Sequence, residues 1–150
     1  MFDFIYYQAR DVMATNPITI DPDSTVSDAQ AIFENHDFNG LPVIDEDGLL
    51  TGMITKLDVL RAFVFSEHFK VPPYHILMKK HVFEVMTRAI ESVEPDTPLT
   101  RVLTRMISTR HKSFPVVENG RLVGIVARED ILGALRRAAQ GEKPARLEQT

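Results

Sequence analysis

The segment GMITKLD, residues 52–58, has a close copy, GIVARED, at residues 124–130. The residues around both segments repeat in the same order. LPVIDEDGLLTGMITKLDVLRA (41–62) aligns with FPVVENGRLVGIVAREDILGA (114–134), and VMATNPITIDPDSTV (12–26) aligns with VMTRAIESVEPDTPL (85–99). A repeat this continuous predicts two copies of one folding unit, and the space between the copies is where we expect a functional site.

The composition is that of an ordinary soluble globular protein: 150 residues, 44% hydrophobic and 25% charged, with a net charge of −4. There is no global basic field to attract nucleic acid or a membrane surface. The chain has no cysteine, which excludes disulfides and thiolate chemistry and favours a cytoplasmic location. No apolar run approaches the roughly 20 residues of a membrane span, and the first residues do not resemble a signal peptide.

Each copy is predicted to fold as β-α-β-β-α, because strand-like and helix-like hydrophobic patterns follow one another in the same order. In the first copy, the expected strands are 18–21, 41–45 and 49–55, with a hairpin turn at 46–48. Its first expected helix is capped by Ser24 and has an apolar face of Val26, Ala29, Ile32 and Phe33. Its second runs from Lys56 to about Phe65, with Leu57, Leu60 and Val64 facing the core.

The second copy repeats this pattern. Its expected strands are 91–94, 114–118 and 122–127, with a hairpin turn at Asn119-Gly120. One expected helix has Thr97 as cap, Pro98 as first residue and an apolar face of Leu99, Val102, Leu103 and Met106, and the other runs from Arg128 to about Ala138.

These patterns predict four segments along the chain. They are the first copy at 9–66, a linker with a short helix at 67–81, the second copy at 82–138, and a polar, flexible C-terminal tail at 139–150.

Thr55 and Asp58 stand where the third strand of the first copy gives way to a helix. Free amides at a helix N-terminus favour an anion such as phosphate, which a hydroxyl also binds. A carboxylate suits a pair of neighbouring hydroxyls, as on a ribose. Gly52 allows a ligand or another backbone segment to come close. A ligand site is therefore one interpretation of these residues.

A capping box is the other interpretation, with Thr55 as the N-cap and Asp58 bonding back to it. One copy alone leaves both interpretations open. In the second copy, Ala127 has lost the hydroxyl while Asp130 is kept. An acid that remains without its capping partner favours a ligand role, although an acid in a first helical turn is also favourable by itself.

The two copies resemble a tandem pair of cystathionine-β-synthase (CBS) domains, a regulatory unit also called a Bateman module, over residues 9–137. The family motif Gly-x-x-Thr/Ser-x-x-Asp is matched fully in the first copy, whereas Ala127 departs from it in the second. The matching residues are Gly52, Thr55, Asp58, Gly124 and Asp130, and VMAT, VMTR, LPVI and FPVV are further family marks. The resemblance implies an α/β fold of two β-α-β-β-α repeats with pseudo-two-fold symmetry, in which small sheets are flanked by helices.

The resemblance also implies a regulatory ligand of adenosine type in clefts between the copies, commonly AMP, ADP or ATP and sometimes S-adenosylmethionine. One copy would hold the ribose and phosphate, and the other the base. For the first cleft the implied residues are Thr55, Lys56, Asp58, Arg88, Ala89, Ile90, Glu91, His111, Lys112 and Ser113, with Asn39 nearby. For the second they are Asp130, Thr15, Asn16, Pro17, Ile18, Phe38, Asn39 and Gly40, with Lys112 nearby.

The first cleft is expected to bind more tightly, because it combines the complete motif with the basic residues Lys56 and Arg110-His111-Lys112. A di- or triphosphate would gain most from these cations. The alternative for each of them is an ordinary solvated surface charge.

We predict a regulatory module that binds an adenine nucleotide and modulates a partner protein. The five histidines lack metal-ligand spacing, and no nucleophile motif is present, so neither a metal site nor catalysis is expected. The rivals are a ligand-free interaction scaffold, in which both acids only cap helices, and a small nucleotide-directed enzyme. We also expect a homodimer, because the helix faces 29–33 and 102–106 are difficult to cover within one chain.

Overall fold

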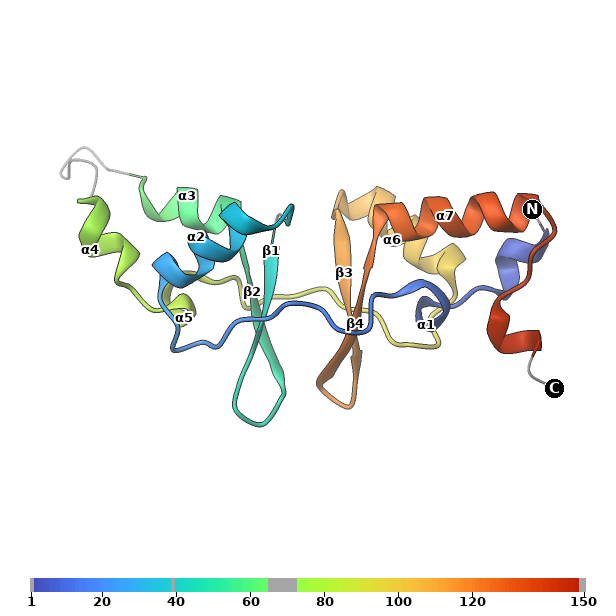
Figure 1. Ribbon diagram of the computed structural model, residues 1–150, viewed down its shortest axis with the longest axis horizontal. Helices are drawn as coiled ribbons and strands as arrows, with labels where there is room; N and C mark the ends of the chain where they lie inside the picture. The colour runs from blue at the N-terminus through green and yellow to red at the C-terminus, as the bar shows by residue number, and fades with distance from the viewer. Residues whose placement is uncertain (1, 39, 65–72, 149–150) are drawn as a thin grey trace. The chain divides into compact units, whose positions relative to one another are not determined.

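The structure is a computed structural model that describes residues 2–38, 40–64 and 73–148 (Figure 1). The chain forms two compact units, which are described separately. Unit 1 contains residues Met1–Pro17 and Glu91–Thr150, and unit 2 contains Ile18–Ile90. Each unit therefore joins the body of one sequence copy to the residues that precede the first strand of the other copy.

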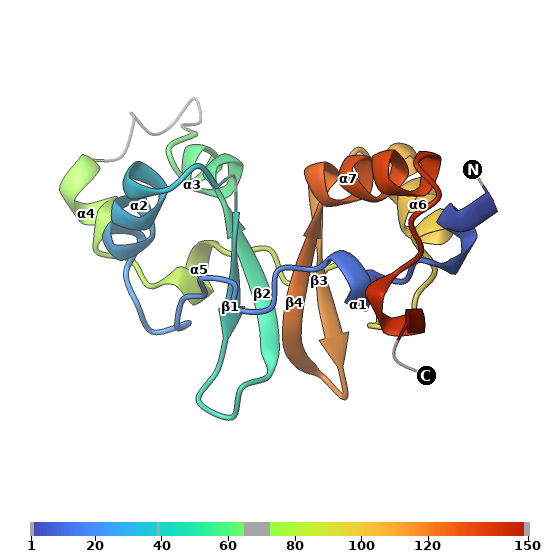
Figure 2. The ribbon, with the colours of Figure 1, turned by 45° about the vertical axis from the view of Figure 1, so that its right-hand side comes forward.

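Unit 2 is built on an antiparallel hairpin of β1 (Gly40–Ile44) and β2 (Leu50–Thr55), in which Gly40 pairs with Thr55. Figures 1 and 2 show two helices beside the end of this hairpin that is opposite its turn. The helices of the unit are α2 (Val26–Asn35), α3 (Lys56–Ala62), α4 (Tyr74–Met78) and α5 (Val82–Val85). Helix α4 is the short helix expected in the linker, whose residues 67–72 lie outside the described part of the chain.

Unit 1 has the same plan, with a hairpin of β3 (Ser113–Glu118) and β4 (Arg121–Ala127). Asn119 and Gly120 both have positive φ, 54° and 80°, as the predicted Asn-Gly turn requires. The helices of the unit are η1 (Phe2–Tyr6), α1 (Ala9–Val12), α6 (Leu99–Thr109), α7 (Arg128–Ala139) and η2 (Ala145–Glu148). Two small antiparallel sheets flanked by helices confirm the predicted fold class.

The expected first strand of each copy is reduced to a single parallel β-bridge. Ile20 bridges Val43 in unit 2, and Val93 bridges Val116 in unit 1. Asp-Pro or Glu-Pro follows directly in each case. Because proline has no N–H to donate to a ladder, the pairing stops after one residue.

The first helix of each copy, α2 or α6, begins one residue after the predicted position. In α2 the cap is Thr25, whose hydroxyl accepts the Asp28 N–H at 3.1 Å while the Asp28 carboxylate accepts the Thr25 N–H at 2.9 Å. A capping box needs an acid three residues after the cap, and Ser24 has none there. In α6 the N-cap is Pro98, because the Thr97 hydroxyl accepts the Glu94 N–H in the preceding turn at 2.9 Å.

The helix faces that were expected to need a partner chain are in fact buried. Ala29 and Phe33 of α2 are 0% and 5% exposed, and Val102 and Met106 of α6 are 0% and 4% exposed. They pack against apolar side chains of the hairpins, which include Leu41, Val43 and Ile54 in unit 2 and Phe114, Val116 and Val126 in unit 1. This argument for a homodimer is therefore wrong.

Helix α3 corrects another expectation. Leu57, Leu60 and Val64 are 53%, 65% and 74% exposed, so they do not face the core. The helix buries Asp58 and Val59 instead and ends at Ala62, short of the predicted end near Phe65, which lies outside the described residues. Helical spacing identifies a stripe but does not say which side of the helix the core covers. The outcome is an exposed apolar stripe on α3.

The C-terminal residues differ from the flexible tail that their composition predicts. Arg146 of η2 donates two hydrogen bonds to the Asp11 carboxylate, at 3.0 and 3.2 Å. The Tyr7 hydroxyl donates to the Glu142 carbonyl at 2.9 Å. The charge-assisted hydrogen bonds of Arg146 anchor this polar segment, and composition does not reveal such bonds. We call residues 141–148 the C-terminal strap.

Candidate functional site

The acid of the first copy, Asp58, forms the capping box that was one interpretation of its motif. Its Oδ2 accepts the Thr55 N–H at 2.9 Å, and the Thr55 hydroxyl accepts the Asp58 N–H at 3.0 Å. This exchange satisfies two otherwise unpaired N–H groups at the start of α3.

The second carboxylate oxygen of Asp58 also has a partner. The Thr87 hydroxyl donates to Oδ1 at 2.8 Å, and the Arg61 guanidinium lies 3.9 Å from the same oxygen. The Asp58 side chain is only 5% exposed. Both oxygens are thus engaged within unit 2, and a ligand hydroxyl would have to displace Thr87 to reach them.

A glycine explains how Thr87 comes so close. A Cβ on Gly52 would lie 2.6 Å from the Met86 sulfur and 2.9 Å from the Thr87 carbonyl oxygen. Thr87 also exchanges two backbone hydrogen bonds with Met53, at 2.8 and 2.9 Å. Gly52 is therefore explained by the close approach of a backbone segment, one of the two possibilities that the sequence offered.

The acid of the second copy, Asp130, has fewer partners. Its Oδ2 accepts the Ala127 N–H at 2.8 Å, and no other described residue donates a hydrogen bond to its carboxylate. Partial burial raises the pKa of Asp130 above its ordinary value. The Ala127 N–H opposes this effect, the neighbouring Glu129 charge adds to it, and the Arg137 charge opposes it. Asp130 therefore keeps one carboxylate oxygen available.

Three substitutions between the copies produce this difference. Each residue that touches Asp58 has a smaller residue at the corresponding position around Asp130. The pairs are Thr55 and Ala127, Thr87 and Ala14, and Arg61 and Gly133. The backbone is the same in both places, since Ala14 bridges Ile125 as Thr87 bridges Met53. The difference between the acids is therefore one of side chains.

The other predicted site residues of unit 2 are more dispersed. The Lys56 ammonium lies 5.9 Å from the centroid of the Phe33 ring, on the side of α3 that meets α2. Arg88 donates to the Phe83 carbonyl at 3.1 Å. The stretch of chain that forms unit 2 begins at Ile18 and ends with Ala89 and Ile90. Gly40 is the first residue of β1, and Asn39 lies outside the described residues.

The remaining predicted residues belong to unit 1. His111 Nδ1 lies 3.5 Å from the Glu91 carboxylate, and both side chains are about half exposed, at 50% and 44%. The Arg128 guanidinium donates to the carbonyls of Arg110 and His111, at 3.1 and 3.3 Å. These bonds order the basic loop, while Lys112 remains exposed. Ser113 pairs with Ala127 in the hairpin, and Thr15, Asn16 and Pro17 follow the Ala14 bridge.

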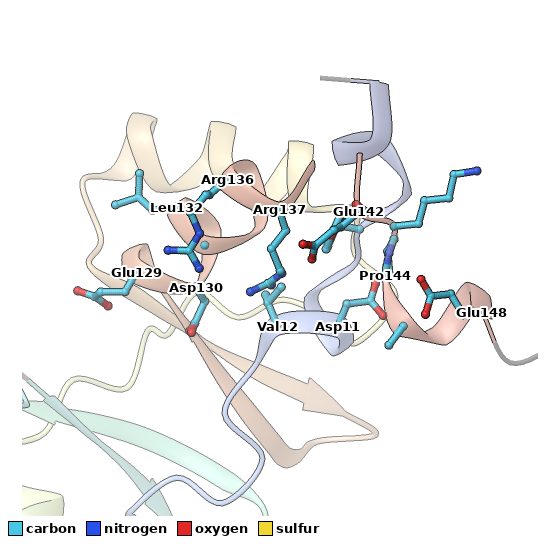
Figure 3. Close-up of a pocket in the computed structure, with 14 residues that line it drawn as sticks. Asp11, Val12, Glu129, Asp130, Leu132, Arg136, Arg137, Glu142, Pro144 and Glu148 are labelled. Carbon is cyan, nitrogen blue, oxygen red and sulfur yellow. Dashed lines mark hydrogen bonds between the residues drawn. The ribbon is translucent and has the colours of Figure 1, made fainter. Parts of the chain in front are cut away.

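Asp130 lines a cavity of about 920 Å³ within unit 1 (Figure 3). Helix α7 forms one wall, the segment from Tyr7 to Val12 another, and the C-terminal strap a third. Of the residues that line this cavity, the sequence predicts only Asp130. The residues it missed include Tyr7, Asp11, Gly133, Arg136, Arg137 and Glu142. Helical spacing from Asp130 would have indicated Gly133 and Arg137, but nothing in the sequence places the strap.

Within residues 2–38, 40–64 and 73–148, no cluster of three or more potential metal-ligating side chains is present. None of the helices described in these ranges is long and apolar enough to cross a membrane.

The family model for the CBS domain matches residues 9–64 and 82–137. The chain belongs to the CBS domain family, which confirms the resemblance inferred from the repeated motifs. It is 32% identical over 123 residues to the L-aspartate semialdehyde sulfurtransferase of Methanocaldococcus jannaschii, which covers 81% of this chain. The chain spans only 22% of the length of that relative.

Two solved structures are similar over their whole length. The CBS domain pair of protein MJ0100, in complex with 5′-methylthioadenosine and S-adenosyl-L-methionine, is 30% identical with a TM-score of 0.68. The match covers 92% of this chain and 99% of that one. CBSX2 in complex with AMP is 25% identical with a TM-score of 0.74, over 89% of this chain and 98% of that one. Both similar proteins hold adenosine compounds.

Proposed function

We propose that this chain is a regulatory module that binds an adenosine-type ligand of the AMP, ADP or ATP class and thereby modulates a partner protein. A ligand regulates only by binding one arrangement of the protein more tightly than another. Membership of the CBS domain family supports the proposal, as do the two similar structures with bound AMP or S-adenosyl-L-methionine.

The observation that carries the proposal is Asp130 at the start of α7, whose carboxylate accepts a single hydrogen bond from the described residues, the Ala127 N–H. A carboxylate with a free oxygen accepts both hydroxyls of a ribose. Asp130 offers such an oxygen in unit 1. The proposed ligand contacts are the residues that the family resemblance implies. The proposed ligand is bound and released without chemical change.

Calorimetric titration of the purified chain with AMP, ADP, ATP and adenosine tests the proposal. We expect saturable binding of at least one of them, with each nucleotide recovered unchanged afterwards. Mass spectrometry of small molecules released by denaturation identifies a ligand that co-purifies. The absence of any binding, with nothing released, would contradict the proposed function, and consumption of ATP would contradict the proposed absence of catalysis.

A second candidate function is a ligand-free interaction scaffold. For both candidate functions we propose that the chain forms a homodimer. Two observations favour the scaffold: both oxygens of Asp58 are engaged internally, and unit 2 exposes large apolar side chains. The exposed side chains are Leu57, Leu60, Val64, Tyr74 and Ile76. Leu57 and Leu60 lie three residues apart on α3, so they are neighbours on one helix face, and a continuous apolar face is typical of an interaction surface. Ligand titration separates the two candidates, because a scaffold binds no adenosine compound.

A further inference from the structure

We infer that the cavity of unit 1 binds a nucleoside carrying a single anionic group, with its ribose at Asp130 and its anionic group at Arg136 and Arg137. This inference rests on the proposed function and specifies the site and the charge of the ligand. It also reverses the order of the two copies that the sequence favours. Three features of unit 1 support it: an unoccupied carboxylate oxygen, two arginines without acidic partners, and an acidic rim.

The first feature is the exposed oxygen of Asp130. Asp58 has a hydroxyl and a guanidinium over its Oδ1, whereas the positions equivalent to Thr87 and Arg61 are Ala14 and Gly133. A hydroxyl donor on a ligand therefore reaches Asp130 without displacing a protein group. Since a charged carboxylate with only one donor is poorly solvated when partly buried, a ribose diol would compensate that cost.

The stability of α7 does not explain why residue 133 is a glycine. In a helix interior, glycine costs roughly 0.5–1 kcal/mol relative to alanine. A Cβ at this position would have only the Arg137 Nη1 nearby, at 3.5 Å, so no backbone contact requires the glycine. It does line the cavity between Asp130 and Arg137. The missing side chain therefore widens the cavity at the point where a ligand would pass from the acid to the arginines.

The second feature is the pair Arg136 and Arg137. Neither guanidinium forms an ion pair with any carboxylate of the described residues, although Arg137 lies 6.0 Å from the centroid of the Tyr7 ring. Both line the cavity, and Figure 3 shows them extending from α7 on the side where Asp130 lies. Guanidinium groups bind phosphate and carboxylate through two parallel hydrogen bonds.

The spacing along α7 suits a nucleoside. Asp130 and Arg137 are seven residues apart, so their Cα atoms lie about 10 Å apart along the axis. Long side chains on a helix lean toward its N-terminus, which brings the guanidinium back toward the acid. The lowering effect of the Arg137 charge on the pKa of Asp130 is consistent with this approach. A ligand held at Asp130 therefore has a guanidinium on the same side of α7.

The third feature limits the charge of the ligand. Glu129, Glu142 and Glu148 also line the cavity, and none has an ion-pair partner in the described part of the chain. Asp11 is neutralised by Arg146. A triphosphate would meet these carboxylates beyond the two arginines, whereas a single phosphate or carboxylate would not. We therefore expect one anionic group to improve binding and further negative charge to weaken it.

The test is calorimetry on the full chain with adenosine, AMP, S-adenosylhomocysteine and ATP. AMP or S-adenosylhomocysteine should bind about tenfold more tightly than adenosine. AMP tests a phosphate, and S-adenosylhomocysteine tests a carboxylate that has an ammonium group beside it. ATP should bind more weakly than AMP. The double variant Arg136→Gln, Arg137→Gln should lower the affinity for AMP to that of adenosine and leave adenosine binding unchanged. Arg101→Gln, an exposed arginine of α6, is the matched control.

Two further variants address the acid. Asp130→Asn should weaken all ligands, including adenosine, by more than Asp58→Asn does. Gly133→Arg introduces the residue that covers Asp58 in the other copy and should also weaken all ligands. Circular dichroism and melting temperature establish that each variant is folded.

The outcomes are distinguishable. If no adenosine compound binds the wild-type chain, the proposed function fails and the inference with it. If AMP binds but the double arginine variant keeps wild-type affinity, the inference alone is wrong. It is also overturned if ATP binds more tightly than AMP, or if Asp58→Asn costs more affinity than Asp130→Asn.

Discussion

The Thr87 hydroxyl donates a hydrogen bond of 2.8 Å to Oδ1 of Asp58, joining the opening residues of the second copy to the first helical turn after β2. Asp58 belongs to the first sequence copy and Thr87 to the second, yet both lie in unit 2. The equivalent residues in unit 1, Ala14 and Asp130, lack this bond because alanine has no hydroxyl. The Thr87 hydroxyl is thus one of the groups that distinguish the structural carboxylate of Asp58 from the available carboxylate of Asp130.

Thr87→Val should destabilise the chain by about 1 kcal/mol, because it leaves one oxygen of the buried Asp58 without a donor. The change keeps the shape of the side chain and removes only the hydroxyl. Urea denaturation provides the measurement, with Thr100→Val on the exposed side of α6 as control. A double-mutant cycle with Asp58→Asn should give a coupling of roughly 0.5 kcal/mol or more, and additive effects would show that the bond contributes no stability.

Gly52→Ala and Gly133→Ala should change stability in opposite directions. A Cβ at position 52 meets the Thr87 carbonyl oxygen at 2.9 Å, and we expect a loss of roughly 1–3 kcal/mol. At position 133 it meets only a flexible guanidinium at 3.5 Å, and the helix should gain about 0.5–1 kcal/mol. Thermal melting compares the two. Destabilisation by both variants would mean that α7 needs its glycine for packing rather than for the cavity.

Arg146→Ala should release the C-terminal strap and lower stability by roughly 1–3 kcal/mol. The Asp11 side chain is 5% exposed and would lose its ion-pair partner, although the Gln8 N–H still donates to it at 2.8 Å. The hydrogen bond to Asp11 also raises the pKa of Arg146, so the guanidinium stays charged at neutral pH. Limited proteolysis should cut residues 141–148 faster in this variant than in Arg101→Ala. Equal cutting rates would indicate that the Tyr7 bond to the strap is sufficient.

Asp130→Asn should be at least as stable as the wild-type chain at pH 7. Burial raises the pKa of Asp130 in the folded state. Its protonated form therefore adds to the stability of the folded chain below the ordinary aspartate pKa, and this contribution is lost as the pH rises through the pKa of the folded state. An uncharged Asn avoids that loss, so its advantage should shrink as the pH falls toward the aspartate range. The Glu129 and Arg137 charges act on the same group in opposite directions.

Asp28→Asn is the matched control for this measurement. Asp28 occupies the same capping position in α2, where its carboxylate accepts the Thr25 N–H in an exposed setting. There the loss of a negative charge near a helix N-terminus should cost a few tenths of a kcal/mol at pH 7. If Asp130→Asn is destabilised as much as Asp28→Asn, Asp130 is better explained as an ordinary cap.

Leu60→Lys should convert a homodimer to a monomer. Leu60 is 65% exposed on α3, beside Leu57, and a charged side chain there would oppose apolar contact between chains. Light scattering should report twice the chain mass of 17.0 kDa for the wild-type protein and a single chain mass for the variant. Leu49→Lys, in the hairpin turn of the same unit, is the control. A wild-type mass of one chain at micromolar concentration would exclude the dimer.

The sequence by itself determined the order of the helices and hairpin strands in each copy and the location of its acid. Val43 and Val116 lie in equivalent hairpins, and Asn119 and Gly120 adopt the positive φ that their turn requires. Short apolar runs and turn residues are recognisable because they act through neighbours in the sequence. The positions of Asp58 and Asp130 in the first turn of a helix follow from the same local rules.

The tertiary structure decided which residues meet these acids. Thr87 lies near Asp58, and Ala14 takes the equivalent place in unit 1, because each unit incorporates the opening residues of the other copy. The outward stripe of α3 and the strap held by Arg146 likewise depend on partners distant in the chain. Secondary-structure propensity depends on neighbours in the sequence. Burial and hydrogen-bond satisfaction depend on tertiary contacts with residues that are distant in the sequence.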